Sequence, residues 1–260
     1  MNAHAGFRDA LVHARALFRR NVLRMARNQS LLFFTITQPA MFVVLFYAVF
    51  SNVVKVPRVV YVDFFVPGVA AQSVTFMCGG TAVGLAEDKQ RGVMDRFRSM
   101  PVARSSVLLG RIGADAVRML VTAVIVFAVG TLVGFRFHSN LFGVVAVFVI
   151  LVLWGVALSI MAANIGLLAP NAETAQAGLY SWLYPATFFS SAFVPAAAMT
   201  GWAQVIARNN PLTFLINGVR AVANGKPAGV PLTKAAIASL VLVIVFTPLA
   251  VWQFNRRLTR

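Results

Sequence analysis

The chain has 260 residues, of which 59% are hydrophobic and only 12% are charged, and its formal net charge is +16. This composition excludes an ordinary soluble domain, because several apolar runs reach the roughly 20 residues that a helix needs to cross a bilayer. A charge of this size could indicate nucleic-acid binding, but the basic residues border the apolar runs and no RNA- or DNA-binding module is present. We therefore expect one all-α membrane domain over residues 1–260, with no nucleic-acid partner.

Residues 5–28, the first segment in chain order, are amphipathic rather than uniformly apolar. Their apolar side chains recur every three or four positions, and arginines occupy the flanks and the far side. This pattern predicts an interfacial helix whose apolar face lies in the acyl boundary and whose arginines face lipid phosphates. A soluble basic tail is the alternative, which the regular apolar stripe disfavours.

Six apolar segments that could span a membrane follow. They cover about residues 31–50, 64–86, 107–134, 141–169, 175–194 and 235–254. Pro39 in the first is tolerable, because neighbouring helices can satisfy the carbonyl that it frees. Gly80 and Gly84 in the second form a small-xxx-small pair, which favours close packing with another helix.

A charged island, EDKQRGVMDRFRSMP, occupies residues 87–101 between the second and third spans. Its apolar residues recur at helical spacing, and Pro101 ends the pattern. We expect a short amphipathic helix over 88–99, held at one membrane surface by the flanking spans. Such a helix is placed to receive a push from a soluble partner.

The first turns of the third span carry Arg111, Asp115 and Arg118 at spacings of four and three. These residues share one helix face, so Asp115 could pair with either arginine.

Residues 195–231, between the fifth and sixth spans, are too broken to cross the membrane and too apolar for a solvated loop. They predict two short helices that dip into the membrane surface as a re-entrant element. Asn210-Pro211 is typical of a helix start, and Asn224-Gly225 of a helix end. A seventh span is the alternative.

The distribution of basic residues predicts the orientation. If the N-terminus is cytoplasmic, 16 of the 23 Lys and Arg residues lie on that side, in the segments from Arg8 to Arg27, from Lys89 to Arg118 and from Arg256 to Arg260. Cytoplasmic segments of membrane proteins are enriched in these residues. Both termini and the island are therefore expected in the cytoplasm, and the re-entrant element outside it.

Several kinds of catalytic chemistry have no signature in the sequence. No G-x-x-x-x-G-K-[ST] phosphate loop occurs, so we do not expect this chain to be an enzyme that hydrolyses ATP. No His, Cys and carboxylate cluster has metal-ligand spacing, so neither a metal site nor catalytic residues are expected. No Asp or Glu falls at mid-membrane, which disfavours an ion-driven transporter.

The chain resembles the permeases of type-2 ABC exporters, and among them the daunorubicin-resistance type. The resemblance covers nearly the whole chain. Its most specific parts are residues 87–96 with Met100-Pro101, and the segments 188–195, 209–213 and 218–222. The family usually has glutamate where this chain has Asp95.

The resemblance implies two permease subunits, identical or homologous, and two cytoplasmic ABC ATPase subunits that bind ATP and Mg. The 88–99 helix would be the coupling helix seated in a groove of the ATPase, flanked by the N-terminal helix. ATP-driven closure would alternate access to a path between the permeases, lined by the first, second and fifth spans. The residues expected to couple to the ATPase are Glu87, Asp88, Arg91, Gly92, Met94, Asp95, Arg96 and Phe97.

We therefore expect an exporter permease in the plasma membrane, in contact with membrane lipids, that moves a hydrophobic or amphipathic drug, antibiotic or lipid. Asn210, Pro211 and Arg220 are expected to belong to an external gate. The rival interpretations are a secondary carrier that needs no ATPase and a membrane-embedded enzyme or scaffold. A neighbouring gene for an ATPase with Walker motifs would favour the exporter.

Overall fold

The structure, a computed structural model, describes residues 29–50, 60–92 and 104–258, and no strand occurs among them. The all-α prediction is confirmed for this part of the chain, and the predicted interfacial helix over 5–28 lies outside it. The helices are α2 (Gln29–Phe50), α3 (Tyr61–Phe76), α4 (Gly79–Gln90), α6 (Arg104–Leu132), α7 (Leu141–Leu168), α8 (Ala172–Phe188), the 3-10 helix η1 (Ala196–Ala198), α9 (Gly201–Asn209), α10 (Pro211–Ala223) and α11 (Gly229–Leu258).

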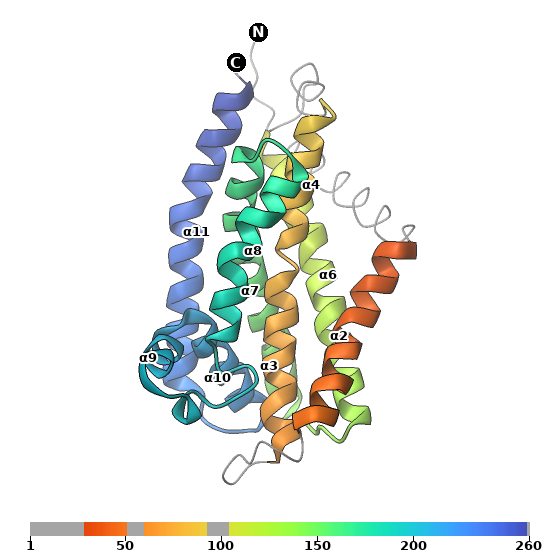
Figure 1. The fold of residues 1–260 in the computed structure, drawn as a ribbon, viewed down its shortest axis with the longest axis vertical. Coiled ribbons are helices and arrows are strands. Elements are labelled where there is room, and N and C mark those ends of the chain that lie inside the picture. Colours follow the sequence, from red (N-terminus) through yellow and green to blue (C-terminus); the bar gives the residue numbers. More distant parts are fainter. Residues whose placement is uncertain (1–28, 51–59, 93–103, 259–260) are drawn as a thin grey trace.

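The long helices form an elongated bundle around α7, which packs against α3, α4, α6, α8, α10 and α11. Figure 1 shows the C-terminal ends of α4 and α11 at one end of this bundle, and α9 and α10 at the opposite end. We call the first of these the charged end, because α4 finishes there with Glu87, Asp88 and Lys89.

Four helical segments in the described ranges are long and apolar enough to cross a membrane. They are Tyr61–Gln90, Gly110–Leu132, Leu141–Leu168 and Gly229–Gln253, which correspond to the second, third, fourth and sixth predicted spans. The apolar part of α2, Thr35–Val49, is shorter, and α8 has 17 residues. Spans at these two helices remain predictions.

The second span is divided at Met77 and Cys78, between α3 and α4. Gly80 N–H bonds to the Met77 carbonyl at 3.2 Å and Thr81 N–H to the Cys78 carbonyl at 3.0 Å, so the chain tightens to three-residue spacing there. Gly79 and Gly80 follow the break, and glycine favours a helix interior less than other residues except proline. The second predicted span therefore consists of two helices, α3 and α4, that meet at this break.

The two short helices expected between the fifth and sixth spans are confirmed as α9 and α10. Asn210 caps α10 by accepting the Leu212 N–H at 2.9 Å, with Pro211 in the first turn. Gly225 follows the helix with φ of 65°, a conformation that favours glycine. Insertion of these helices into the membrane surface remains a prediction.

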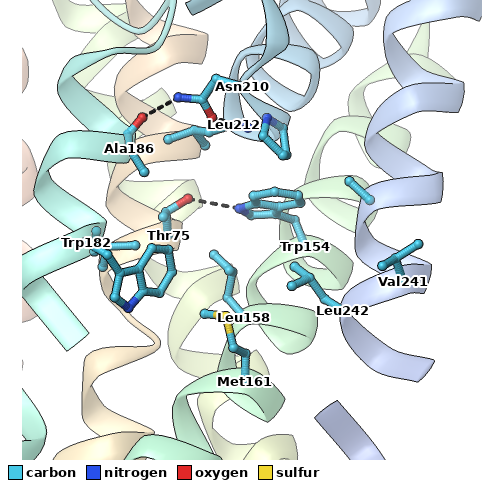
Figure 2. Close-up of a pocket in the computed structure, with 13 residues that line it drawn as sticks. Thr75, Trp154, Leu158, Met161, Trp182, Ala186, Asn210, Leu212, Val241 and Leu242 are labelled. Atoms are coloured by element: carbon cyan, nitrogen blue, oxygen red, sulfur yellow. Dashed lines mark hydrogen bonds between the residues drawn. The ribbon is translucent and has the colours of Figure 1, made fainter. Parts of the chain in front are cut away.

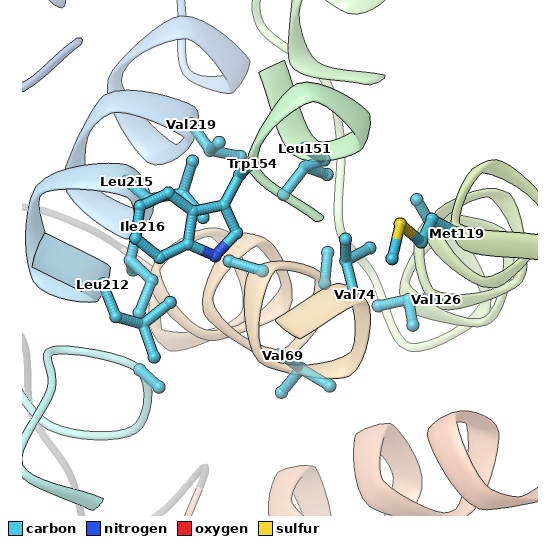
Figure 3. Close-up of a cluster of buried hydrophobic side chains, with 14 of the residues drawn as sticks. Val69, Val74, Met119, Val126, Leu151, Trp154, Leu212, Leu215, Ile216 and Val219 are labelled. Atoms are coloured by element: carbon cyan, nitrogen blue, oxygen red, sulfur yellow. The ribbon is translucent and has the colours of Figure 1, made fainter. Parts of the chain in front are cut away.

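Helix α10 contributes directly to the hydrophobic core. Figure 3 shows Leu215 and Ile216 of α10 beside Trp154 of α7, with Val74 of α3 and Met119 of α6 further along the same cluster. All five side chains are buried. The amphipathic stripe that the sequence shows over 212–222 therefore faces the other helices, which explains why α10 is stable at only 13 residues.

Candidate functional site

The predicted coupling region begins with the last turn of α4 rather than with a new helix. Residues 88–90 belong to α4, which ends at Gln90, and Gly92 has φ of 65°. That left-handed conformation suits glycine and interrupts a helix, so a helix running unbroken from 88 to 99 is wrong at its start. Met94, Asp95, Arg96 and Phe97 lie outside the described residues, and their coupling role remains a prediction.

Asp88 forms an ion pair with α6. Its Oδ2 lies 2.7 Å from Nη1 of Arg111, and both side chains are partly buried. Arg111 also donates from Nη2 to the Gly80 carbonyl at 3.3 Å. Asp88 therefore connects the charged end of α4 to the third span, a contact that the family resemblance, which implies only a role toward the ATPase, did not predict.

Lys89 connects the same turn to α7. Its Nζ donates to the carbonyl of Ala169, the residue after α7, at 2.8 Å. A positive charge at the C-terminal end of a helix is favourable, because the free carbonyls there carry partial negative charge. By contrast, Glu87 and Arg91 pair with each other at 3.3 Å on the surface, so they remain accessible to a partner protein.

A second ion pair lies deeper along α6. Arg118 Nη2 is 2.7 Å from Asp115 Oδ1, and Thr81 Oγ1 donates to Asp115 Oδ2. Arg118 Nη2 also donates to the Met77 carbonyl at 2.8 Å, at the break in the second span. Of the two pairings that the spacing allowed, Asp115 thus takes Arg118, and Arg111 takes Asp88.

The small-xxx-small pair has a different use from the predicted one. A Cβ at Gly84 would overlap the guanidinium of Arg111, and a Cβ at Gly80 would overlap that of Arg118. The two glycines therefore make room for arginine side chains of α6 rather than for another helix backbone. That close backbone approach occurs instead at Gly166 of α7, where a Cβ would overlap the Ala82 carbonyl oxygen.

The three residues expected to form an external gate lie at the two ends of α10. Asn210 Nδ2 donates to the carbonyls of Ala186 and Phe189 and so holds the start of α10 against the end of α8. Arg220, three turns later, donates to the Phe64 carbonyl at 2.8 Å, and its guanidinium lies 3.6 Å from the centre of the Phe64 ring. The structure thus fastens α10 at both ends and does not bring the three residues to one opening.

An apolar cavity of about 310 Å³ lies between α7, α8, α10 and α11. Figure 2 shows Trp154 of α7 and Trp182 of α8 on opposite sides of it. It is lined by Thr75, Trp154, Leu158, Met161, Trp182, Leu183, Ala186, Asn210, Pro211, Leu212, Ala238, Val241 and Leu242. The sequence gives no sign of this cavity, because uniformly apolar runs do not reveal which side chains leave a gap.

A smaller groove lies between the first and second spans, where the resemblance implied a path. Its volume is about 30 Å³, and Gln38 and Pro39 of α2 and Gln72 and Ser73 of α3 contribute to its walls. Nearby, Phe76 of α3 contacts the Tyr180 and Tyr184 rings of α8 at centroid distances of 5.8 and 5.3 Å. Helices α2, α3 and α8 therefore contribute polar and aromatic groups to one region.

Comparison with known proteins shows which family the sequence of this chain matches. Residues 13–223 match the ABC-2 type transporter family. The chain is 30% identical over 222 residues to the daunorubicin resistance ABC transporter permease protein DrrB1 of Streptomyces coeruleorubidus, a match covering 85% of this chain and 78% of that protein. It is 28% identical to the probable doxorubicin resistance ABC transporter permease protein DrrC of Mycobacterium tuberculosis, over 89% of this chain and 84% of the relative.

Proposed function

Because the chain belongs to the ABC-2 type transporter family, we propose that it is the permease subunit of an ATP-driven exporter in the plasma membrane. It would work with two cytoplasmic ABC ATPase subunits, which bind ATP and Mg, and with a second permease that is identical or homologous. The names of its relatives, which refer to daunorubicin and doxorubicin resistance, support a hydrophobic or amphipathic drug or antibiotic as cargo. An amphipathic lipid has the same chemical character.

The connection of the charged end of α4 to two other spans is the observation that best supports this mechanism. A push on the segment after Gly92 would reach α6 through Asp88 and Arg111, and α7 through Lys89. In this proposal the charged end is cytoplasmic, as the positive-inside distribution predicts. The exposed Glu87 and Arg91 would then face the ATPase.

The break in the second span provides a place for this motion to change the fold. Helix α4 packs mainly against α7 and α8, whereas α3 packs mainly against α6 and α10. The two halves of the span therefore have different main neighbours, although both also contact α6 and α7, and they are joined at Met77 and Cys78. We propose that ATP-driven movement of α4 alters the angle at this break and thereby alternates access to the cargo path.

We propose that the path runs along the region shared by α2, α3 and α8, between two permeases. Large apolar side chains on α2 and α8 are exposed there in the single chain, among them Met41, Leu45 and Phe188. Exposed apolar surface of this kind suits either a partner subunit or an amphiphile. The polar groups Gln38 and Gln72 could bind the polar part of such a cargo.

The test is transport by the complete complex in proteoliposomes, with doxorubicin as the probe. The permease is purified with its ATPase partner, and we expect movement of doxorubicin that requires ATP and stops when the Walker lysine of the ATPase is changed to alanine. Doxorubicin movement that follows a proton gradient and needs no ATPase would refute the proposal and favour a secondary carrier.

A further inference from the structure

The apolar cavity lies at the middle of the membrane-spanning helices. Thr75 is close to the midpoint of Tyr61–Gln90, Trp154 to that of Leu141–Leu168, and Val241 to that of Gly229–Gln253. In a protein whose spans cross a bilayer, the midpoints of the spans lie at the centre of the hydrocarbon layer. A lipid headgroup does not reach that depth, whereas the distal part of an acyl chain does.

The chemistry of the lining selects a hydrocarbon occupant. Trp154 Nε1–H donates to Thr75 Oγ1 at 3.0 Å, and Thr75 in turn donates to the Ala71 carbonyl. Asn210 accepts the Leu212 N–H and donates to the carbonyls of Ala186 and Phe189 at the C-terminal end of α8. Thr75, Trp154 and Asn210 thus have protein partners, and apart from the Trp182 indole N–H the rest of the wall is apolar. A polar ligand would therefore lose its hydrogen bonds to water with little replacement.

The cavity opens between α8 and α11. Both helices pack against α7, but across the described residues no substantial packing joins α8 to α11. Figure 2 shows Trp182 on one side of the space and Val241 and Leu242 on the other. Val241 is 52% exposed, which places it at the mouth, where the surrounding medium in the membrane is acyl chains.

We propose that this cavity binds the distal part of one acyl chain of a bilayer phospholipid, which enters between α8 and α11. The acyl chain replaces the missing contact between α8 and α11. An empty cavity would deprive its lining of dispersion contacts, and water is disfavoured there because the lining is almost entirely apolar. This site is separate from the proposed cargo region at α2, α3 and α8 and does not depend on the identity of the cargo.

The buried indole of Trp154 provides a direct measurement. Trp154 is only 3% exposed, and the chain has four tryptophans, so changing Trp182, Trp202 and Trp252 to phenylalanine leaves one reporter. The full chain is reconstituted in phosphatidylcholine vesicles whose acyl chains carry bromine, a contact quencher of indole emission. We expect bromines in the distal half of the chain to remove most of the Trp154 emission, and bromines near the carbonyl to remove much less.

Filling the cavity with a larger side chain should protect the Trp154 emission from quenching by the brominated acyl chains. Ala238 of α11 and Ala186 of α8 line opposite walls, so Ala238→Phe and, independently, Ala186→Leu should restore most of the emission. Ala236→Phe is the matched control, because Ala236 lies on the same helix as Ala238 but is exposed and outside the lining; it should leave the quenching unchanged. Using both walls keeps the test valid if one filled variant does not fold.

Three outcomes would overturn the proposal. The Trp154 emission could be unaffected by brominated acyl chains, which would mean that no acyl chain enters the cavity. Quenching could persist in both filled variants, which would mean that bromine reaches the indole by another route. Finally, added doxorubicin could quench Trp154 where brominated chains do not, which would make the cavity a cargo site instead.

Discussion

Asp88 at the end of α4 and Arg111 near the start of α6 form an ion pair, with Oδ2 and Nη1 2.7 Å apart. The pair joins residues that are 23 positions apart in the sequence. Gly84 leaves the space that the guanidinium occupies, and the Gly80 carbonyl accepts a further hydrogen bond from it. Three residues of α4 therefore position Arg111 of the third span. Asp88 pairs with it, the Gly80 carbonyl accepts a hydrogen bond from it, and Gly84 leaves room for it.

Asp88→Asn should separate binding of the ATPase from coupling to it. The amide keeps the shape but removes the charge, so we expect doxorubicin transport and drug-stimulated ATP hydrolysis to fall several-fold while the ATPase still co-purifies. The loss of stability should be about 1 kcal/mol or less, because the pair is partly exposed. Transport, hydrolysis and thermal unfolding in detergent measure the three quantities.

Glu173→Gln is the control for this substitution, because Glu173 in the first turn of α8 is exposed and is not among the residues expected to contact the ATPase. The double variant Asp88→Arg/Arg111→Asp reverses the pair and should recover part of the activity that either single change removes. If the losses of activity caused by the two single changes simply add in the double variant, Asp88 and Arg111 are not coupled.

Gly84→Ala should destabilise the protein although alanine favours helices. In an open helix position, alanine in place of glycine stabilises by roughly 0.5–1 kcal/mol. At Gly84 the new methyl group would displace the Arg111 guanidinium, so we expect a lower unfolding temperature. Gly178→Ala in α8 is the matched control, because the nearest atom to its added Cβ is 3.8 Å away; an unfolding temperature raised equally by both changes would contradict the assigned role of Gly84.

Asn210→Ala should loosen the junction of α8 and α10. The change removes a helix cap, which costs roughly 0.5–2 kcal/mol, together with the hydrogen bonds to the Ala186 and Phe189 carbonyls. We expect a lower unfolding temperature and slower doxorubicin transport, with ATPase recruitment intact. Asn209→Ala should have little effect, because Asn209 is exposed and bonds only to Val205 of its own helix in the described structure; loss of recruitment in Asn210→Ala would contradict an external role for α10.

Labelling of introduced cysteines should reveal the orientation. Gln90 at the charged end and Thr200 before α9 are both exposed, and Cys78, the single natural cysteine, is buried. In a Cys78→Ser background and in intact cells, Thr200→Cys should react with a membrane-impermeant thiol reagent, and Gln90→Cys should react only after the cells are opened. The opposite pattern would invert the topology and remove the charged end from the reach of an ATPase.

The signals that the sequence carried were local. Apolar runs of sufficient length indicate membrane helices wherever they occur, because the bilayer sets the required length. Asn210 and Pro211 mark the start of α10 because capping involves only neighbouring residues. The shared face of Arg111, Asp115 and Arg118 follows from the helical repeat alone.

Tertiary structure decided the choice among partners. The spacing allowed Asp115 to pair with Arg111 or Arg118. In the structure Asp115 pairs with Arg118, and Arg111 pairs with Asp88 because α4 lies beside α6. The same neighbour explains why Gly80 and Gly84 accommodate guanidinium groups, which a small-residue pattern does not distinguish from helix packing. The cavity beside Trp154 depends on how far α8 and α11 stand apart on α7, and such a distance between helices has no counterpart in the order of residues within any one of them.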